Sequence, residues 1–107
     1  MELEVYWLEL AKSKLDDIYD YYTYKASRKT AKSLVDGIID KTLQLVDQPF
    51  VGQIEENLIN RPEKFRYLVY KNYKIIYWVN TDKKRIEIAN VFDTRQDPDK
   101  LGENAAT

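Results

Sequence analysis

Basic and tyrosyl side chains alternate along residues 65–98, and two of the basic ones are the first candidates for chemistry. Arg66 and Lys74 stand on either side of a short polar turn, near the ends of two expected neighbouring strands. If both side chains lie on one face, they form a cationic pair suited to phosphate, because arginine offers a planar fork and lysine a point charge. The same residues would also serve as charges that protect exposed strand edges, and the sequence leaves both interpretations open.

Arg95 is a third basic candidate, and it follows the last expected strand in the segment VFDTRQDP. An arginine beside aspartates is most often paired locally. The alternative is that Arg95 lies above the sheet and completes a cationic site with Arg66 and Lys74. Arg66 and Arg95 are also candidates for binding a partner protein.

Four tyrosines, Tyr19, Tyr21, Tyr22 and Tyr24, fall within six positions at the end of an expected helix. Their rings cannot all face the core, so some must be exposed or cover the edge of a sheet. Exposed tyrosines are frequent at protein interfaces, because a large ring with a polar tip loses little entropy on binding. Tyr19, Tyr21 and Tyr24 are therefore candidate partner-binding residues, unless they lie flat on the surface around a core-facing Tyr22.

The chain has 107 residues and contains neither histidine nor cysteine. These absences exclude Ser–His and Cys–His catalytic pairs, histidine-based metal centres and thiolate metal sites. No metal and no cofactor is expected, and acid–base chemistry would fall to Lys, Tyr, Asp or Glu side chains or to the substrate. No apolar run approaches the roughly 20 residues that span a membrane, and no secretory signal opens the chain, so we expect a cytoplasmic protein without membrane contact.

Positive charge is concentrated in the middle of the chain, although the net charge is only −1. Residues 61–88 carry 8 basic and 3 acidic side chains, a net of +5, whereas residues 1–60 carry 7 basic and 11 acidic ones, a net of −4. A positive segment between acidic flanks could form an anion-facing sheet, since local potential rather than net charge attracts a ligand. An ordinary solvated strand face would have the same composition.

The spacing of apolar residues predicts the elements that must position these side chains. Residues 2–7 alternate with a period of two, which predicts a strand, and the stripe from Leu8 to Tyr22 has helical spacing, with Lys14 on its solvated side. Ser27 is the expected cap of a second helix, in which Gly37 would let the two helices approach closely.

Three further strands are predicted in the second half of the chain. Pro49 and Gly52 end the helical region, and a polar loop follows with a brief extended piece at 54–59. Asn72, which accepts the left-handed conformation, marks the first tight turn. The predicted strands are residues 64–70, 73–79 and 85–92.

This order of elements predicts an α+β fold. An N-terminal strand and an antiparallel helical hairpin would pack on a mainly antiparallel sheet of about four strands, which is an economical way to bury both helical stripes. A chain of this length forms one domain, expected over residues 1–98. Residues 99–107 are expected to be a polar tail, too short and too polar to add to the core.

The order and spacing of these motifs resemble the RelE/ParE superfamily, the toxins of bacterial type II toxin–antitoxin (plasmid stabilisation) modules. The resemblance covers nearly the whole chain and implies the fold predicted above, together with a cognate antitoxin protein as partner. It rests on the helix pattern Trp7, Ala11, Leu15, Ile18 and Tyr22, the loop pattern Leu45, Pro49 and Gly52, and the strand sequences RYLVYKNYKIIYWV and IEIANVFDTRQDP.

The resemblance implies one of two activities. RelE-type toxins cleave mRNA on the ribosome by promoting attack of a ribose 2′-hydroxyl on the adjacent phosphate, and the positions that match their basic residues are Arg66, Lys74 and Arg95. ParE-type toxins inhibit DNA gyrase by binding it. This chain has no histidine, no tyrosine after Tyr77 and an acidic tail, and these departures favour a ParE-like gyrase inhibitor. A non-toxic interaction module on the same fold is the third possibility.

Overall fold

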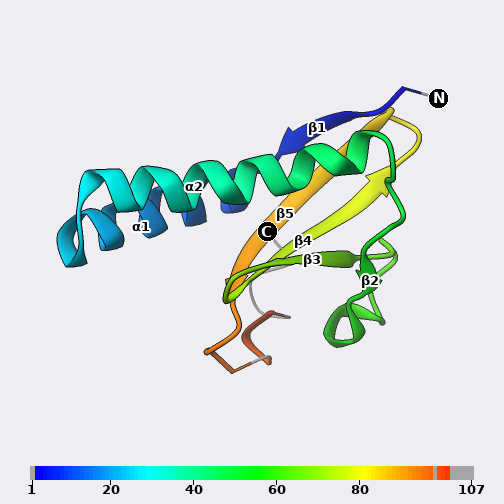
Figure 1. Ribbon diagram of the computed structural model, residues 1–107. Coiled ribbons are helices and arrows are strands. Elements are labelled where there is room, and N and C mark those ends of the chain that lie inside the picture. The colour runs from blue at the N-terminus through cyan, green and yellow to red at the C-terminus, as the bar shows by residue number, and fades with distance from the viewer. Residues whose placement is uncertain (1, 98, 102–107) are drawn as a thin grey trace.

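The computed structural model describes residues 2–97 and 99–101 and has two layers (Figure 1). Helices α1 (Glu9–Lys25) and α2 (Arg28–Leu43) form an antiparallel hairpin on one face of a sheet. The predicted α+β fold class is confirmed. The strands are β1 (Glu4–Trp7), β2 (Gln53–Ile54), β3 (Arg66–Tyr70), β4 (Tyr73–Asn80) and β5 (Arg85–Asp93), and short 3-10 turns form η1 (Gln44–Val46) and η2 (Glu56–Leu58).

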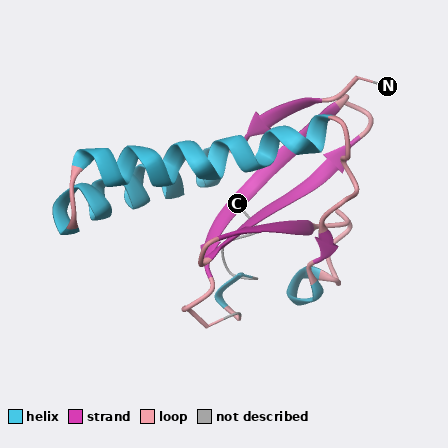
Figure 2. Cartoon of the chain, viewed as in Figure 1, coloured by secondary structure: helices cyan, strands magenta, loops and turns pink. Residues whose placement is uncertain are grey.

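The strands lie in the order β1-β5-β4-β3-β2, and they are the magenta arrows of Figure 2. β1 pairs in parallel with β5, whereas all other neighbours pair antiparallel. The predicted number of about four strands missed β2, because two residues are too few to show a period of two. The extended piece expected at 54–59 is also shorter than predicted, since η2 occupies residues 56–58.

The first core cluster lies between the helical hairpin and the sheet. The Ser27 hydroxyl accepts a hydrogen bond from the main-chain N–H of Thr30 at 3.1 Å, so the predicted cap of α2 is confirmed. From Ala11 onward the predicted apolar stripe of α1, like that of α2, faces the strands, which removes these side chains from water. Leu8, the first residue of the predicted stripe, precedes α1 and packs on the opposite face of the sheet. The largest fully buried members are Ile38, Leu45, Ile75, Tyr77, Ile86 and Ile88.

A second apolar cluster lies on the opposite face of the sheet. Phe65, Ile76 and Phe92 of the strand region meet Leu58 of η2 and Leu101 of the C-terminal segment there. Leu101 is fully buried. The expectation that the tail adds nothing to the core is therefore wrong at this position, and the rest of the predicted tail, residues 102–107, lies outside the described residues.

Two details of the backbone differ from expectation. A Cβ at Gly37 would collide with the side chain of Tyr70, so this glycine makes room for a tyrosine of β3 rather than for α1. In the turn between β3 and β4 the left-handed residue is Lys71, with φ 54°, and not Asn72. The Asn72 amide instead donates to Oδ1 of Asp93 at 3.2 Å and holds the end of β5.

Candidate functional site

The register of the sheet separates Arg66 from Lys74. The two-residue turn between β3 and β4 places Arg66 opposite Tyr77 and Lys74 opposite Val69. Tyr77 belongs to the core under the helices, and paired residues share a face, so Arg66 lies on the helix-covered side. Lys74, three residues before Tyr77, alternates onto the other side. The predicted cationic pair does not form.

Lys74 is held by a buried carboxylate and an aromatic ring. Its Nζ lies 2.9 Å from Oε1 of Glu55 and 4.2 Å from the centroid of the Tyr67 ring. The side chain of Glu55 is only 2% exposed, and its Oε2 accepts hydrogen bonds from the main chain and side chain of Asn57. Lys74 therefore has a structural role, because removing it would leave the buried Glu55 carboxylate without a compensating charge.

Arg66 stabilises the loop that leads into β2. Its Nη1 donates to the main-chain carbonyls of Phe50 and Gly52, at 3.2 and 2.8 Å. The guanidinium also lies 5.5 Å from the centroid of the exposed Phe50 ring, within range of a cation–π contact. Arg66 therefore combines a structural role with an exposed aromatic neighbour that a partner could contact.

Arg95 is paired locally, which is one of the two predicted alternatives. Its Nη2 lies 2.7 Å from Oδ2 of Asp93 and its Nε 3.0 Å from Oδ1. The Arg95 hydrogen bonds lower the pKa of Asp93 to about 2, and the carboxylate in turn raises the pKa of Arg95. Arg66 pairs with Tyr77, and Asp93 pairs with Tyr73. The length of β4 between Tyr73 and Tyr77, roughly 13 Å, therefore separates Arg66 from Asp93.

The tyrosines lie at the far end of the hairpin. Tyr19, Tyr21 and Tyr24 are exposed to 36%, 52% and 85%, whereas Tyr22 packs against the first core cluster. The predicted division into exposed rings and one core-facing ring is therefore confirmed. The rings of Tyr21 and Tyr22 meet edge to face, with centroids 5.1 Å apart.

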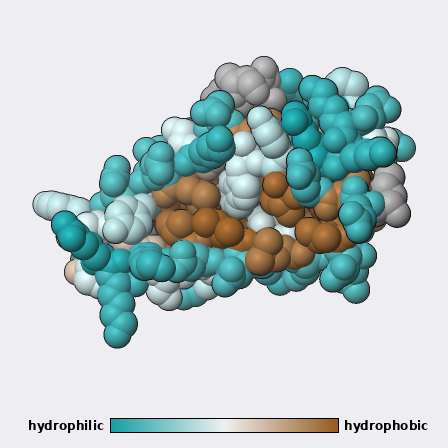
Figure 3. Space-filling model, turned by 90° about the horizontal axis from the view of Figure 1, so that it is seen from above, coloured by the Kyte–Doolittle hydropathy of each residue, from teal (hydrophilic) through white to brown (hydrophobic). Residues whose placement is uncertain are grey.

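Apolar side chains are also exposed at the other end of the hairpin. Figure 3 looks down on the molecule and shows an apolar surface bordered by hydrophilic side chains. Leu43 at the end of α2 and Val46 of η1 are exposed to 55% and 43%. The helical layer thus offers tyrosines at its tip and aliphatic side chains near its base, and both are suited to contact with another chain.

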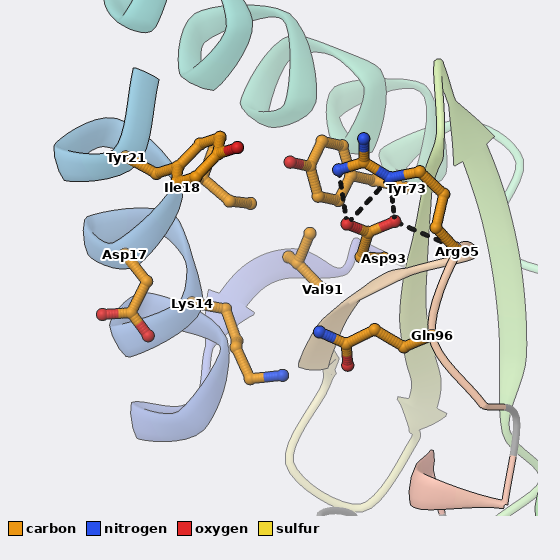
Figure 4. Close-up of a pocket in the computed structure, with 9 residues that line it drawn as sticks. All are labelled: Lys14, Asp17, Ile18, Tyr21, Tyr73, Val91, Asp93, Arg95 and Gln96. Atoms are coloured by element: carbon orange, nitrogen blue, oxygen red, sulfur yellow. Dashed lines mark hydrogen bonds and ion pairs between the residues drawn. The ribbon is translucent and has the colours of Figure 1, made fainter. Parts of the chain in front are cut away.

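A cleft between α1 and the end of β5 brings Tyr21 together with Arg95 (Figure 4). Its volume is about 490 Å³. Lys14, Ile18 and Tyr21 of α1 line one side of the cleft, and Val91, Asp93 and Arg95 line the other. The three basic residues predicted from the sequence do not converge here, since only Arg95 lines this cleft.

Lys14 was misplaced by the sequence analysis, which put it on the solvated side of the first helix. It is half-buried, and burial lowers the pKa of its ammonium group against an opposing attraction from Asp17. Lys14 lies three residues after Ala11 and four before Ile18, which places it beside the buried stripe. This spacing was a usable signal for the position of Lys14.

The remaining polar groups of the cleft had no sequence signal. Tyr73, Asp93 and Gln96 reach it only because β5, which pairs with β4, packs against α1, a contact between distant parts of the chain. Burial and a hydrogen bond with Tyr22 raise the pKa of Tyr73. Its phenol is therefore held more firmly in the protonated form, which can donate a hydrogen bond.

The three basic residues expected from the sequence are held at separate places by different partners. Lys74 is tied to Glu55 and Arg95 to Asp93, and Arg66 lies at a third location. In the part of the chain that the structure describes, no group of three or more His, Cys, Asp or Glu residues could hold a metal ion. No helix within residues 2–97 and 99–101 is long and apolar enough to cross a membrane.

Sequence comparison decides the family. The model of the ParE toxin of the type II toxin–antitoxin system parDE matches residues 5–98. The chain belongs to the ParE toxin family. The match begins at the second residue of β1 and extends beyond the end of β5, so it includes both helices and the other four strands in full. None of the curated protein sequences compared with this ParE-family toxin matches it significantly.

Solved structures share the fold of this ParE-family toxin. A chain of the chromosomal ParDE toxin–antitoxin system from P. aeruginosa superimposes with a TM-score of 0.70 and 22% identity, covering 86% of this chain and 96% of that one. The E. coli toxin RelE, as a double arginine-to-alanine mutant in the free state, gives a TM-score of 0.62 and 16% identity, covering 99% and 96%. At these identities the likeness extends to the fold alone.

Proposed function

We propose that this ParE-family toxin arrests growth by binding DNA gyrase and not by cutting RNA. The observation that carries the proposal is the dispersal of Arg66, Lys74 and Arg95 over two faces and opposite ends of the sheet. Cleavage of a phosphodiester needs acid, base and charge-stabilising groups within hydrogen-bond reach of one phosphate. Inhibition by binding needs only a complementary surface.

The basic segment, residues 61–88, would form the gyrase-binding surface together with Arg95, which follows β5. Its net charge of +5 would attract an acidic surface of the enzyme or the DNA that the enzyme holds. Arg66 with the exposed Phe50 ring supplies a cation and an aromatic anchor at one edge of this surface. These residue types are frequent among those that contribute most to protein–protein affinity.

A cognate antitoxin would bind the other layer, the helical hairpin. The exposed Tyr19, Tyr21 and Tyr24 at its tip, with Leu43 and Val46 near its base, support this assignment. A chain that folds on binding is suited to such a surface, because it can reach both ends of the hairpin at once. Recovery of the toxin from its native host without any small partner protein would count against an antitoxin.

The decisive test is DNA supercoiling by purified gyrase with added toxin. We expect inhibition that weakens as salt is raised, because exposed charges are screened beyond about 8–10 Å at physiological ionic strength. Reversing Arg66 and Arg95 together to glutamate should raise the toxin concentration needed for half-inhibition by about tenfold. The matched control is Lys12→Glu, which reverses an exposed charge on α1, outside the basic segment.

Three results would change the assignment. Unimpaired supercoiling together with cleavage of ribosome-bound mRNA by the purified toxin would establish the RelE-like alternative. Normal growth when the chain is expressed without its neighbours would favour a non-toxic interaction module. Growth arrest with neither gyrase inhibition nor mRNA cleavage would reject both of the named targets.

A further inference from the structure

A second cleft, of about 340 Å³, lies between the start of α2 and the turn that joins β3 to β4. In Figure 1 the joined ends of the two helices extend past the sheet, and this tip cleft lies where the overhang begins. Lys29 of α2 and Lys71 of the turn line it. Neither lysine forms a salt bridge with any residue of the ranges 2–97 and 99–101. The Lys71 ammonium lies 5.8 Å from the centroid of the Tyr70 ring, a weak contact that leaves its charge uncompensated.

The groups of the tip cleft that a ligand can reach are hydrogen-bond donors. Both lysines are exposed, and so are Thr30 and Ser33, which line the cleft with them. The Thr30 hydroxyl accepts a hydrogen bond from Oγ of Ser27 at 3.1 Å, which leaves its own proton available. The Ser33 hydroxyl has no hydrogen bond within the described part of the chain. Leu34, the aliphatic residue of the cleft, is only 8% exposed. Ammonium and hydroxyl donors without apolar surface suit the several oxygens of a phosphate.

Both sides of the tip cleft are held in place by hydrogen bonds. The Asn72 carbonyl accepts from the main-chain N–H and the hydroxyl of Thr94, at 2.8 and 2.9 Å, and the Asn72 amide donates to Asp93 at 3.2 Å. On the other side, the Ser27 hydroxyl caps α2 by accepting from the N–H of Thr30 at 3.1 Å. The backbone that carries the two lysines therefore needs little ordering when a ligand binds, which favours affinity.

Two carboxylates lie near the tip cleft, and each already has a cation of its own. Asp93 is bound by Arg95 at 2.7 Å, and Asp36, which lines an adjoining surface cleft, is bound by Lys32 at 2.6 Å. Asp40 lies two turns further along α2, roughly 10 Å along the helix axis, where salt screens its charge. The two lysines of the tip cleft are therefore the charges that an anion would meet there.

Basic side chains continue from the tip cleft around the end of the hairpin. Residues 21–35 carry four of them, Lys25, Arg28, Lys29 and Lys32, and no acidic residue. Lys25 and Arg28 are exposed and have no salt bridge among the residues that the structure describes. A run of cations suits a polymer of phosphates, because every phosphate neutralised releases counterions and adds to affinity. An acidic peptide is less suited, since no arginine lines the cleft to pair with a carboxylate as a planar fork.

We propose that the tip cleft binds a phosphate of a single-stranded nucleic acid, and that neighbouring phosphates of the same strand lie along Lys25 and Arg28. Lys29 and Lys71 contact the phosphate from two sides, and the hydroxyls of the cleft donate to its oxygens. Binding of this kind reads no base sequence, because the contacts go to the backbone. The inference does not rest on gyrase as the target, because it concerns the toxin and the strand alone.

The test is fluorescence anisotropy of two labelled strands of about 12 nucleotides, an oligothymidylate and an oligouridylate, with the full-length toxin. We expect equal affinities within about threefold, because DNA and RNA present the same phosphates. The logarithm of the binding constant should fall with the logarithm of the salt concentration with a slope of about −3, for four phosphates at about −0.7 each. No binding at about 100 µM toxin and low salt would overturn the proposal.

A labelled peptide of about 12 glutamates distinguishes nucleic acid from an acidic protein as the ligand. It carries a similar charge but presents carboxylates, so it should bind at least about tenfold more weakly than the strands. Equal or tighter binding of this peptide would assign the tip cleft to an acidic protein partner and overturn the proposal. A preference of more than about tenfold for one of the two strands would contradict contacts to the phosphates alone.

Two double variants assign binding to the tip cleft. Lys29→Gln with Lys71→Gln should weaken binding of both strands by at least about tenfold and make the salt slope shallower by about 1.4, the contribution of two phosphates. Lys12→Gln with Lys100→Gln removes the same charge from exposed positions elsewhere and should change affinity by less than about twofold. Equal weakening by the two double variants would show that overall charge alone attracts the strand, and would refute the site.

A further pair of variants tests the position of the phosphate without removing a cation. Ser33→Asp places a carboxylate one turn from Lys29 and should weaken binding of both strands by at least about tenfold. Ser13→Asp, at an exposed position of α1, is the matched control and should bind like the parent. If Ser33→Asp also binds like the parent, the phosphate does not lie in the tip cleft. Gyrase is absent from these titrations, so their failure would leave the supercoiling assay to decide the proposed target.

Discussion

Glu87 stabilises the face of the sheet that lies opposite the helices. Its carboxylate accepts hydrogen bonds from Trp78, Asn80 and Arg85 at 3.0, 3.1 and 2.7 Å. Burial alone would raise the pKa of Glu87, but these three donors outweigh burial and lower it. Arg85 also lies 3.8 Å from the centroid of the Tyr6 ring, so one carboxylate links β4 and β5 to the edge strand β1.

Tyr77 carries a buried hydrogen bond whose removal has a predictable cost. Its hydroxyl accepts the main-chain N–H of Gly52 at 2.9 Å, and both residues are buried. Tyr77→Phe should lower the free energy of unfolding by about 1–3 kcal/mol, because the N–H of Gly52 loses its partner away from water. Urea unfolding measures this change. Tyr24→Phe, on a side chain that is 85% exposed, is the matched control and should change stability little.

Asp93 should make stability depend on pH in the acid range. Arg95 lowers its pKa in the folded protein to about 2, below the value of about 3.9 for an unfolded aspartate. The stabilisation is therefore complete above about pH 4 and is lost as pH falls from about 4 to 2. Asp93→Asn should cost about 1 kcal/mol at pH 7, since Arg95 is largely exposed and solvent screens the pair.

Urea unfolding at several pH values tests this prediction. The parent protein should lose stability relative to Asp93→Asn as pH falls, so that the two proteins converge near pH 2. A difference in stability that stays constant from pH 7 to pH 2 would contradict the assignment of this carboxylate.

At the scale of elements, the C-terminal segment is part of the domain rather than an appendage. Leu101 is fully buried against Leu58, Phe65 and Phe92 in the second cluster. Leu101→Ala should lower the free energy of unfolding by about 2–5 kcal/mol, because it leaves a cavity under the sheet. Lys100→Ala, at the exposed neighbouring position, is the control. Equal stability of the two variants would contradict the position of this segment.

The sequence predicted elements well where their period was long enough to read. Five or more strand residues in alternation, or three helical turns with one apolar stripe, specify both the element and its buried face. β2 has two residues and η2 three, so neither contains a full period. Contacts with distant residues determine their positions instead. Arg66 donates a hydrogen bond to the main chain of Gly52, and β2 pairs with β3.

The sequence was sufficient to predict on which faces of the sheet Arg66 and Lys74 lie. Across this two-residue turn, each even-numbered residue of β3 pairs with an odd-numbered residue of β4 and shares its face of the sheet. Arg66 and Lys74 both have even numbers, so they lie on opposite faces. The cleft between α1 and the end of β5 could not be predicted from the sequence. It joins Lys14 to Gln96, and no local pattern reports that α1 lies beside the end of β5.

At the scale of the whole molecule, the parallel pairing of β1 with β5 determines when the fold can be completed. Glu4 pairs with Arg85 and Trp7 with Ile88, so the first strand finds its place only beside the last. Contacts between such distant segments form late, because a long loop must close before they contribute stability. During synthesis β1 has no strand to pair with until residue 88 has been added. A chain that stops before β5 lacks the partner strand of β1, so its sheet cannot be completed.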